Sequence, residues 1–261
     1  MGLLEGKRAL VCGSSQGIGR AIAENFARSG AEVVLLARDA DKLDTVSKQL
    51  DRSRNQKHGF LCADFAQPDI LQELLAARLP EIGTIQLLVN NTGGPPGGVI
   101  RDARGDDFLD AFSKHLICNQ ILVQAVLEGM KRESFGRIIN IISTSVRAPI
   151  PGLGVSNTIR GAVASWAKTL AGELGPFGIT VNNILPGFTE TARLASIIEH
   201  KAKETKQSCE KIAEAMRATI PVGRFARPEE IANAAEFLAS EHASYINGVN
   251  LPVDGGRLDC L

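Results

Sequence analysis

Three glycines in a short run are the first residues whose type and spacing point to chemistry. Residues 13–19 read GSSQGIG, and they follow a short apolar segment and open a helical pattern. The first glycine permits a turn out of a strand, the second lets backbone approach a pyrophosphate, and the third lets helix pack against strand. The start of the helix supplies free N–H donors and a positive dipole. The predicted dinucleotide-phosphate residues are Gly13, Ser15, Gln16, Gly17, Ile18 and Gly19.

The end of the second apolar run distinguishes between two dinucleotides. It lies about 20 residues beyond the loop, where such folds read the ribose 2′ position. An acidic residue in place of Ala37 would accept hydrogen bonds from the ribose hydroxyls and favour NAD, but alanine cannot. The planar guanidinium of Arg38 can bind a 2′-phosphate through two hydrogen bonds. This pattern predicts NADP, with NAD as the weaker candidate. The alternative is that Arg38 caps the strand and pairs with Asp39 or Asp41.

Apolar β-rich runs alternate with helical patterns along the whole chain. Strands are expected over 8–12, 31–37, 59–62, 85–90, 137–142, 179–185 and 249–253, and helices over 17–28, 40–50, 70–79, 106–130, 156–174 and 229–239. Apolar strands separated by helices indicate a parallel sheet that is buried on both faces. The expected fold is therefore α/β, a single doubly wound Rossmann domain over residues 1–261, with about seven strands and helices on both faces.

One segment interrupts this rhythm. Residues 188–221 hold charged, amphipathic helical sequence between a Pro-Gly turn and a Pro-Val-Gly turn. An insertion after the carboxyl end of a strand lies where such sheets bind ligands. We interpret it as a small helical lid over the substrate. A surface helical pair without a gating role is the alternative.

Composition excludes several classes of partner. Lys plus Arg and Asp plus Glu both total 29, and aromatics make up 5%, so neither nucleic acid nor an anionic membrane is an expected partner. Five scattered cysteines without C-x-x-C spacing are typical of reduced thiols in a cytoplasmic protein rather than a metal site. No apolar run approaches the length that spans a membrane.

Further motifs, taken together with the glycine loop, resemble the short-chain dehydrogenase/reductase family, and its 3-oxoacyl-acyl-carrier-protein reductase-like members in particular. The stretches that carry the resemblance are 90–93 (NNTG), 136–143 (GRIINIIS), 178–182 (GITVN), 186–187 (PG), 228–232 (PEEIA) and 253–256 (VDGG). The resemblance implies a homo-oligomer, a tetramer or a dimer. It also implies cofactor contacts from Asp64, Asn90, Gly93, Pro186, Gly187 and Thr191.

The family acts through a Tyr-x-x-x-Lys pair, and the matching positions here hold Ser156 and Arg160. The chain has one tyrosine, Tyr245, which lies near the C-terminus. An alkanol is a far weaker acid than a phenol, whose pKa is about 10. Arginine retains the positive charge of lysine but does not carry protons. The site therefore departs from the usual proton path, although Arg160 can still hold a ribose hydroxyl or a phosphate.

Two further catalytic positions follow from the same resemblance. Ser143 stands thirteen residues before Ser156, as the family's serine does, and can hydrogen-bond a carbonyl; capping the end of a strand is its alternative role. The family's asparagine position falls on His115. An imidazole titrates near neutrality and could serve as a substitute general acid. The favoured interpretation is a helix histidine that fills the space.

The sequence is therefore compatible with two functions. The first is an NADP(H)-dependent oxidoreductase that acts on a small carbonyl or alcohol, acyl thioesters included, with Ser143, Ser156, Arg160 and His115 at its catalytic site. The second is a catalytically inactive nicotinamide-binding protein with a sensing or partner-binding role. The first is favoured because Ser143, a positive charge at Arg160 and the lid segment are all retained.

Overall fold

The computed structural model describes residues 2–260. Its centre is a seven-stranded sheet in the order β3-β2-β1-β4-β5-β6-β7, with every neighbouring pair parallel. The strands are β1 (Arg8–Cys12), β2 (Glu32–Ala37), β3 (Gly59–Cys62), β4 (Leu87–Asn90), β5 (Gly136–Ile141), β6 (Ile179–Pro186) and β7 (Asn250–Val253). The chain reverses direction across the sheet between β3 and β4, so β1 and β4 flank the switch point. The expected single doubly wound sheet is confirmed.

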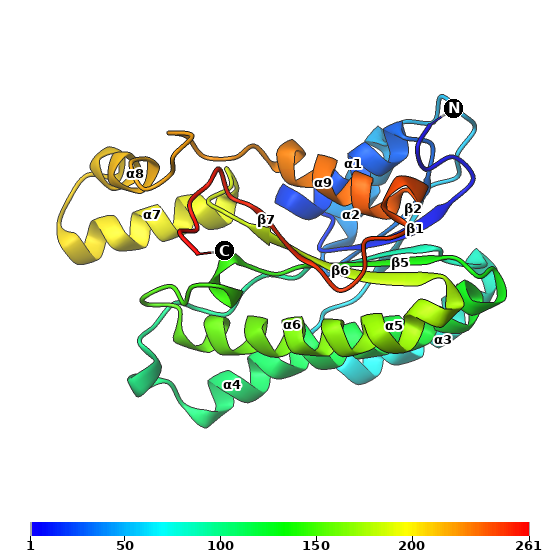
Figure 1. Cartoon of the computed structure of the whole chain (residues 1–261), viewed down its shortest axis with the longest axis horizontal. Helices are drawn as coiled ribbons and strands as arrows, with labels where there is room; N and C mark the ends of the chain where they lie inside the picture. Colours follow the sequence, from blue (N-terminus) through cyan, green and yellow to red (C-terminus); the bar gives the residue numbers. More distant parts are fainter. Residues whose placement is uncertain (1, 261) are drawn as a thin grey trace.

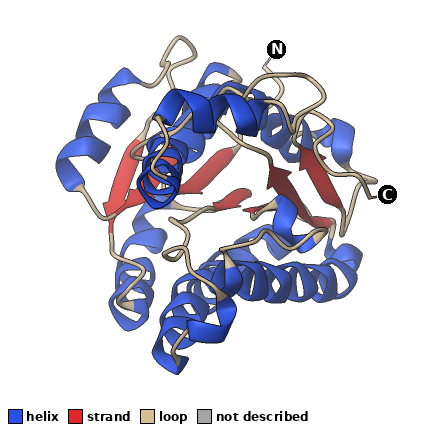
Figure 2. Cartoon of the chain, turned by 90° about the vertical axis from the view of Figure 1, so that its left-hand side faces the viewer, coloured by secondary structure: helices blue, strands red, loops and turns tan. Residues whose placement is uncertain are grey.

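Helices cover both faces of the sheet, as Figures 1 and 2 show. The helices are α1 (Gly17–Arg28), α2 (Ala40–Gln49), α3 (Pro68–Ile82), α4 (Gly105–Phe112), α5 (Cys118–Arg132), α6 (Gly154–Leu174), α7 (Ala192–Thr205), α8 (Cys209–Arg217) and α9 (Pro228–Ala239). Helices α1, α2 and α9 pack on one face, and α3, α5 and α6 pack on the other (Figure 1). Helices α7 and α8 stand apart at one end of the molecule. No helix within residues 2–260 is long and apolar enough to cross a membrane.

Alternating side chains of the strands feed two separate cores. Val11, Leu35 and Val89 pack under α1 and α9, whereas Leu10 and Leu88 pack against the helices of the opposite face. Each fully buried Leu or Val of this kind stabilises the fold by about 1.5–3 kcal/mol. Burial on both faces explains why the strands read as continuous apolar runs. This double core holds the carboxyl ends of the strands in fixed positions.

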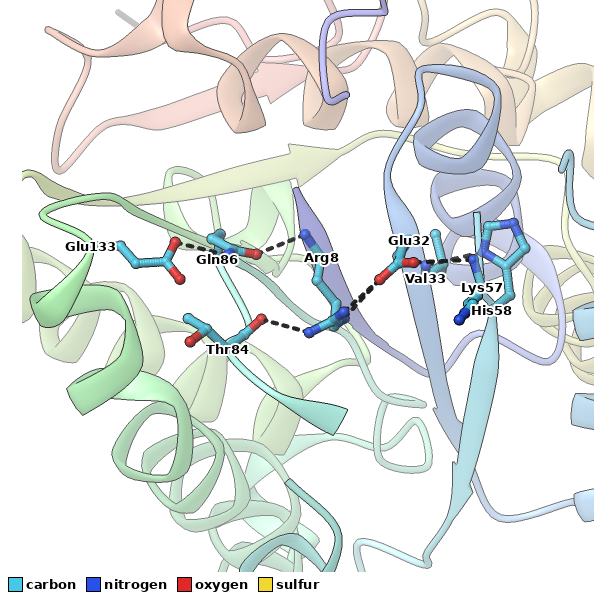
Figure 3. A network of polar contacts seen from close by, with 8 residues as sticks. All are labelled: Arg8, Glu32, Val33, Lys57, His58, Thr84, Gln86 and Glu133. Carbon is cyan, nitrogen blue, oxygen red and sulfur yellow. Dashed lines mark hydrogen bonds and ion pairs between the residues drawn. The ribbon is translucent and has the colours of Figure 1, made fainter. Parts of the chain in front are cut away.

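A polar network lies at the amino-terminal ends of β1 and β2 (Figure 3). Arg8 donates to Glu32 from both Nε and Nη2, at 3.0 and 2.6 Å, and so ties β1 to β2. Gln86 accepts from the Arg8 backbone N–H at 2.7 Å and donates to Glu133 at 2.8 Å. Burial alone raises the pKa of Glu32, but hydrogen bonds from Arg8 and from the Lys57 N–H outweigh it and leave the pKa below its usual value. The network therefore stabilises the pairing of β1 with β2.

An asparagine ladder crosses four neighbouring strands. Asn90, Asn140, Asn183 and Asn250 occupy one register row from β4 to β7. The Nδ2 of each of the first three asparagines donates to the Oδ1 of the next one at 2.8 Å, and in this ladder Asn250 only accepts. Asn140 is fully buried, and Asn90 and Asn183 are each about 2% exposed. The ladder satisfies both side-chain polar atoms of Asn140 and Asn183, whereas the Oδ1 of Asn90 is buried without a partner among residues 2–260.

The expected long helix over 106–130 is not continuous. Helices α4 and α5 are joined by a π-helical segment, Ser113–Ile117, which contains His115. A π segment inserts an extra residue into the helical ladder and changes the direction in which its side chains point. The apolar spacing of the sequence carries no signal for this interruption. The other expected elements are confirmed to within three residues at each end.

Candidate functional site

A cleft of about 960 Å³ opens at the carboxyl ends of the strands. Its walls come from the loop after β1, the segment after β4, the end of β5, the start of α6, and α7. This position beside the β1/β4 switch point is where doubly wound sheets bind ligands. The cleft brings together the glycine loop and the predicted catalytic residues.

The glycine loop has the geometry that its sequence predicts. Gly13 and Gly17 have φ of +60° and +57°, a region that favours glycine. A Cβ on Gly13 would stand 2.6 Å from Asn91 Nδ2, so the loop lies directly against the segment after β4. A Cβ on Gly19 would stand 2.7 Å from the same nitrogen and would also clash with the Gly13 carbonyl oxygen. Gly13 and Gly19 therefore act through close packing, and the packing sets the position of α1.

The N-terminus of α1 is open for an anion. Its N-cap residue, Gln16, makes no side-chain cap hydrogen bond, and no acid occupies the first turn. The backbone N–H groups of this turn are therefore available, and the helix dipole favours negative charge there. Ser15, Gln16, Gly17 and Ile18 line the cleft, and a Cβ on Gly17 would stand 3.3 Å from Thr191 Cγ2. A pyrophosphate fits this surface, which combines exposed donors with the absence of side chains.

Arg38 lies in the cleft wall at the end of β2. Asp39, one of its suggested partners, instead pairs with Lys42 at 2.8 Å and caps α2. Within residues 2–260, Arg38 forms no ion pair with Asp39 or Asp41. Its guanidinium is thus an exposed cation at the corner where a ribose 2′ substituent is read.

Most of the other predicted contact residues also line the cleft. They are Asp64, Gly93, Pro186, Gly187 and Thr191. Asp64 Oδ1 accepts from the Ala66 N–H at 2.9 Å, which fixes the turn after β3. Asn90 differs, because its side chain is committed to the asparagine ladder and does not line the cleft. The next two residues, Asn91 and Thr92, reach the cleft in its place.

The proposed catalytic residues converge where β5 ends and α6 begins. Arg160 is 9% exposed and donates from Nη1 to the Ile141 carbonyl oxygen at 2.9 Å. Ser143 Oγ accepts from the Ser145 N–H at 3.1 Å, so its own hydrogen is left to donate to a ligand. Ser143, Ser156 and Arg160 all line the cleft. Burial, followed by the charge of Arg193, lowers the pKa of Arg160 to about 10, so it stays protonated at neutral pH.

His115 also lines the cleft beside this group, although it is only 2% exposed. Burial, followed by the nearby charge of Arg160, lowers the pKa of His115 to about 2. The ring is therefore neutral in the physiological range. This favours the interpretation of His115 as a space-filling residue over that of a general acid.

Sequence reasoning missed Arg193, in the first turn of α7. Its Nη2 donates to the Pro95 carbonyl oxygen at 2.8 Å, and the residue lines the cleft. Arginine near the start of a surface helix gives no signal that it points into a site. The helix is held there by Thr191, whose Oγ1 accepts from the Leu194 N–H at 3.4 Å.

The segment 188–221 forms α7 and α8, as expected, and has a small core of its own. Leu194, Ile212 and Met216 are buried in it, and Phe188 packs edge-on against Phe225 at 6.2 Å between ring centroids. Several residues on its β6 side, from Phe188 to Ile197, line the cleft. Helix α7 is therefore part of one wall of the site, whereas no residue of α8 lines the cleft.

A parallel doubly wound sheet with a glycine loop at its switch point defines a dinucleotide-binding α/β protein. The family model described as enoyl-(acyl carrier protein) reductase matches residues 13–257. The chain is 34% identical to the 3-oxoacyl-(acyl-carrier-protein) reductase FabG of Vibrio cholerae, over 97% of this chain and 98% of that protein. It is 32% identical to the gluconate 5-dehydrogenase of Gluconobacter oxydans, over 97% and 95%. The chain therefore belongs to the short-chain dehydrogenase/reductase family.

Solved structures agree with this assignment. L-sorbose reductase from Gluconobacter frateurii, crystallised with NADPH and L-sorbose, superposes with a TM-score of 0.93 at 31% identity. All of this chain and all of that chain are covered. The fold of this chain, α7 and α8 included, is thus similar to that of L-sorbose reductase over its whole length.

Proposed function

We propose that this protein is an NADP(H)-dependent oxidoreductase that acts on a small carbonyl or alcohol. The observation that carries the proposal is the single cleft in which the open N-terminus of α1, the exposed Arg38 and the Ser143–Arg160 group all meet. A family relative with reductase activity in its name and a structural neighbour crystallised with NADPH support it. When bound, NADPH supplies the hydride.

The cofactor contacts follow from the walls of the cleft. The loop over residues 13–19 would hold the pyrophosphate through backbone N–H groups, and Arg38 would hold the 2′-phosphate. Asp64 and Gly93 would line the adenosine side, and Pro186, Gly187 and Thr191 the nicotinamide side. The exposed Arg38 is the reason that NADP is preferred over NAD.

Ser143 and Arg160 act on the substrate oxygen. We propose that Ser156 and Arg160 occupy the positions of the family's Tyr-x-x-x-Lys pair. Ser143 donates its free hydroxyl hydrogen to the carbonyl, and Arg160 stabilises negative charge that develops on the oxygen. Both groups are held in place beforehand by backbone contacts of β5 and the turn after it, so little reorganisation is needed at the moment of reaction.

The proton comes from water in this proposal. Ser156 is too weak an acid, the pKa of Arg160 is about 10, and the pKa of His115 is about 2. None of these three side chains can therefore act as a general acid that protonates the alkoxide and is reprotonated near neutral pH. Residues 188–221 serve as the lid that limits water to the few molecules at the site.

Steady-state oxidation of NADPH against a panel of ketones, hydroxyketones and 3-oxoacyl thioesters tests the proposal. Ser143→Ala and Arg160→Ala should each lower kcat/KM by about 100-fold, as loss of an oxyanion donor does. Cys260→Ser, an exposed change near the C-terminus and outside the cleft, is the control and should leave the rate unchanged. Full activity in both site variants would show that the assigned mechanism is wrong.

A further inference from the structure

Two arginines from different helices meet across a glycine in the cleft. Arg160 belongs to α6 and Arg193 to α7. A Cβ built on Gly94 would stand 3.8 Å from Nη2 of each arginine. The two Nη2 atoms are thus no further apart than twice that distance. Arg160 is buried and Arg193 is exposed, so their like charges repel each other across the cleft wall, and an anion between them would offset this repulsion.

No carboxylate of the protein neutralises the two arginines. Within residues 2–260, neither forms an ion pair, and each makes one hydrogen bond, to a backbone carbonyl oxygen. Lys114, another cation that lines this part of the cleft, is already paired with Asp110 at 2.7 Å. A guanidinium has five N–H donors, so most donors of both forks remain available.

The buried arginine makes this more than a surface cluster. Arg160 is 9% exposed, and an unpaired charge at that depth is costly unless a partner arrives. The main influences on the pKa of Arg160, its burial and then Arg193, both disfavour the charged form. The protein keeps an uncompensated cation here, as a site does when its ligand brings the negative charge.

We propose that Arg160 and Arg193 form a subsite for an oxyanion of the substrate, a carboxylate held beside the reacting carbonyl. This inference rests on the proposed function and names its substrate class, an oxo acid or hydroxy acid. A carboxylate whose two oxygens each accept a charge-assisted hydrogen bond of about 2.8 Å can bridge two donors at this separation. Gly94 lines the cleft beside both arginines and has no side chain, so it leaves room for the carboxylate.

Calorimetry on the protein saturated with NADP⁺ tests the subsite. The probes are acetoacetate, its neutral counterpart acetoacetamide, and inorganic phosphate. Acetoacetate should bind at least about tenfold more tightly than acetoacetamide, because only the acid forms charge-assisted hydrogen bonds. Phosphate should compete with it. Equal binding of the acid and the amide would overturn the inference.

Substitutions at positions 193 and 94 distinguish the effect of charge on acetoacetate binding from the effect of side-chain shape. Arg193→Gln should remove the preference for the acid, whereas Arg132→Gln, an exposed change at the end of α5, should retain it. Gly94→Asp would place the protein's own carboxylate between the arginines and should abolish binding of acetoacetate. Gly94→Asn has the same shape without the charge and should retain the preference for the acid. Equal effects of Asp and Asn would contradict the charge argument.

The cofactor is the other source of an oxyanion. The same titration of phosphate into protein without NADP⁺ distinguishes the two sources. If phosphate binds only before NADP⁺ is added, the arginines serve the cofactor phosphates and the subsite is overturned. If NADP⁺ itself does not bind, the proposed function fails first. Binding of NADP⁺ without any preference for the acid overturns the subsite alone.

Discussion

Arg160 donates from Nη1 to the backbone carbonyl oxygen of Ile141 at 2.9 Å, and Ile141 is the last residue of β5. Ile141 stands two residues before Ser143, so one strand end fixes both the cation and the hydroxyl of the proposed site. The contact uses a planar fork that lysine does not have. The position can therefore hold a charge rigidly without moving protons.

Selectivity for NADP(H) should depend on Arg38. Arg38→Ala should weaken binding of NADPH by about 10- to 100-fold, as loss of charge-assisted hydrogen bonds to a phosphate does, and leave NADH unchanged. Fluorescence titration with both cofactors measures this. Lys42→Ala is the control at the same corner, because Lys42 is already engaged by Asp39. A parallel loss of NADH affinity would show that Arg38 acts on structure instead.

Two glycine-to-alanine substitutions should have opposite effects on stability, because one glycine is closely packed and the other is not. Gly19→Ala should destabilise the protein by more than about 2 kcal/mol, because its Cβ would overlap Gly13 and Asn91. Gly172→Ala, in α6, meets nothing within 4 Å and should stabilise by about 0.5–1 kcal/mol. Urea unfolding compares both with the parent protein. A tolerated Gly19→Ala would contradict the packing described here.

Buried His115 should make stability depend on pH. Its pKa is about 2 in the folded chain and about 6.5 when unfolded, so between these values only the unfolded state binds the proton. The stabilisation is fully present above pH 6.5 and is lost as the pH falls. Relative to His115→Asn, the parent should lose about 2 kcal/mol between pH 8 and pH 5. A constant difference in unfolding free energy across this range would contradict a neutral buried ring.

The asparagine ladder should be cooperative. Asn140→Ala removes the acceptor for Asn90 and the donor for Asn183, and both are buried. Leaving two such groups unsatisfied costs about 2–6 kcal/mol. Asn250→Ala, at the end of the ladder, breaks one bond and should cost about half as much. Chemical denaturation of both variants measures the ratio, and equal losses would argue against the ladder.

The sequence predicted the fold well because the fold depends on local rules. Glycines at 13, 17 and 19 have steric reasons that hold in any strand-to-helix turn, and apolar runs predict buried parallel strands. Arg38 could be placed in the cleft wall because its position follows from the end of β2, and its role at the cofactor stays a prediction. Asn90 was placed at the cofactor by resemblance, but the structure commits its side chain to the ladder.

The substrate side depends on long-range geometry, and the sequence carried little of it. The π segment that turns His115 inward breaks a helix whose apolar spacing is continuous. The low pKa of His115 comes from packing around it, which no local pattern encodes. Arg193 and Arg160 are 33 positions apart in the sequence, and only the fold brings their charges together at Gly94.

The proposed function requires that hydride moves between NADPH and a carbonyl in this cleft. Incubation of the protein with NADPH carrying deuterium at C4 and the carbonyl panel, 3-oxo acids included, tests it by mass spectrometry of the products. We expect one deuterium in a product alcohol, transferred from one face of the nicotinamide, and a much lower yield with Ser143→Ala. Tight binding of NADPH without deuterium in any product would contradict it and would favour a binding protein without turnover.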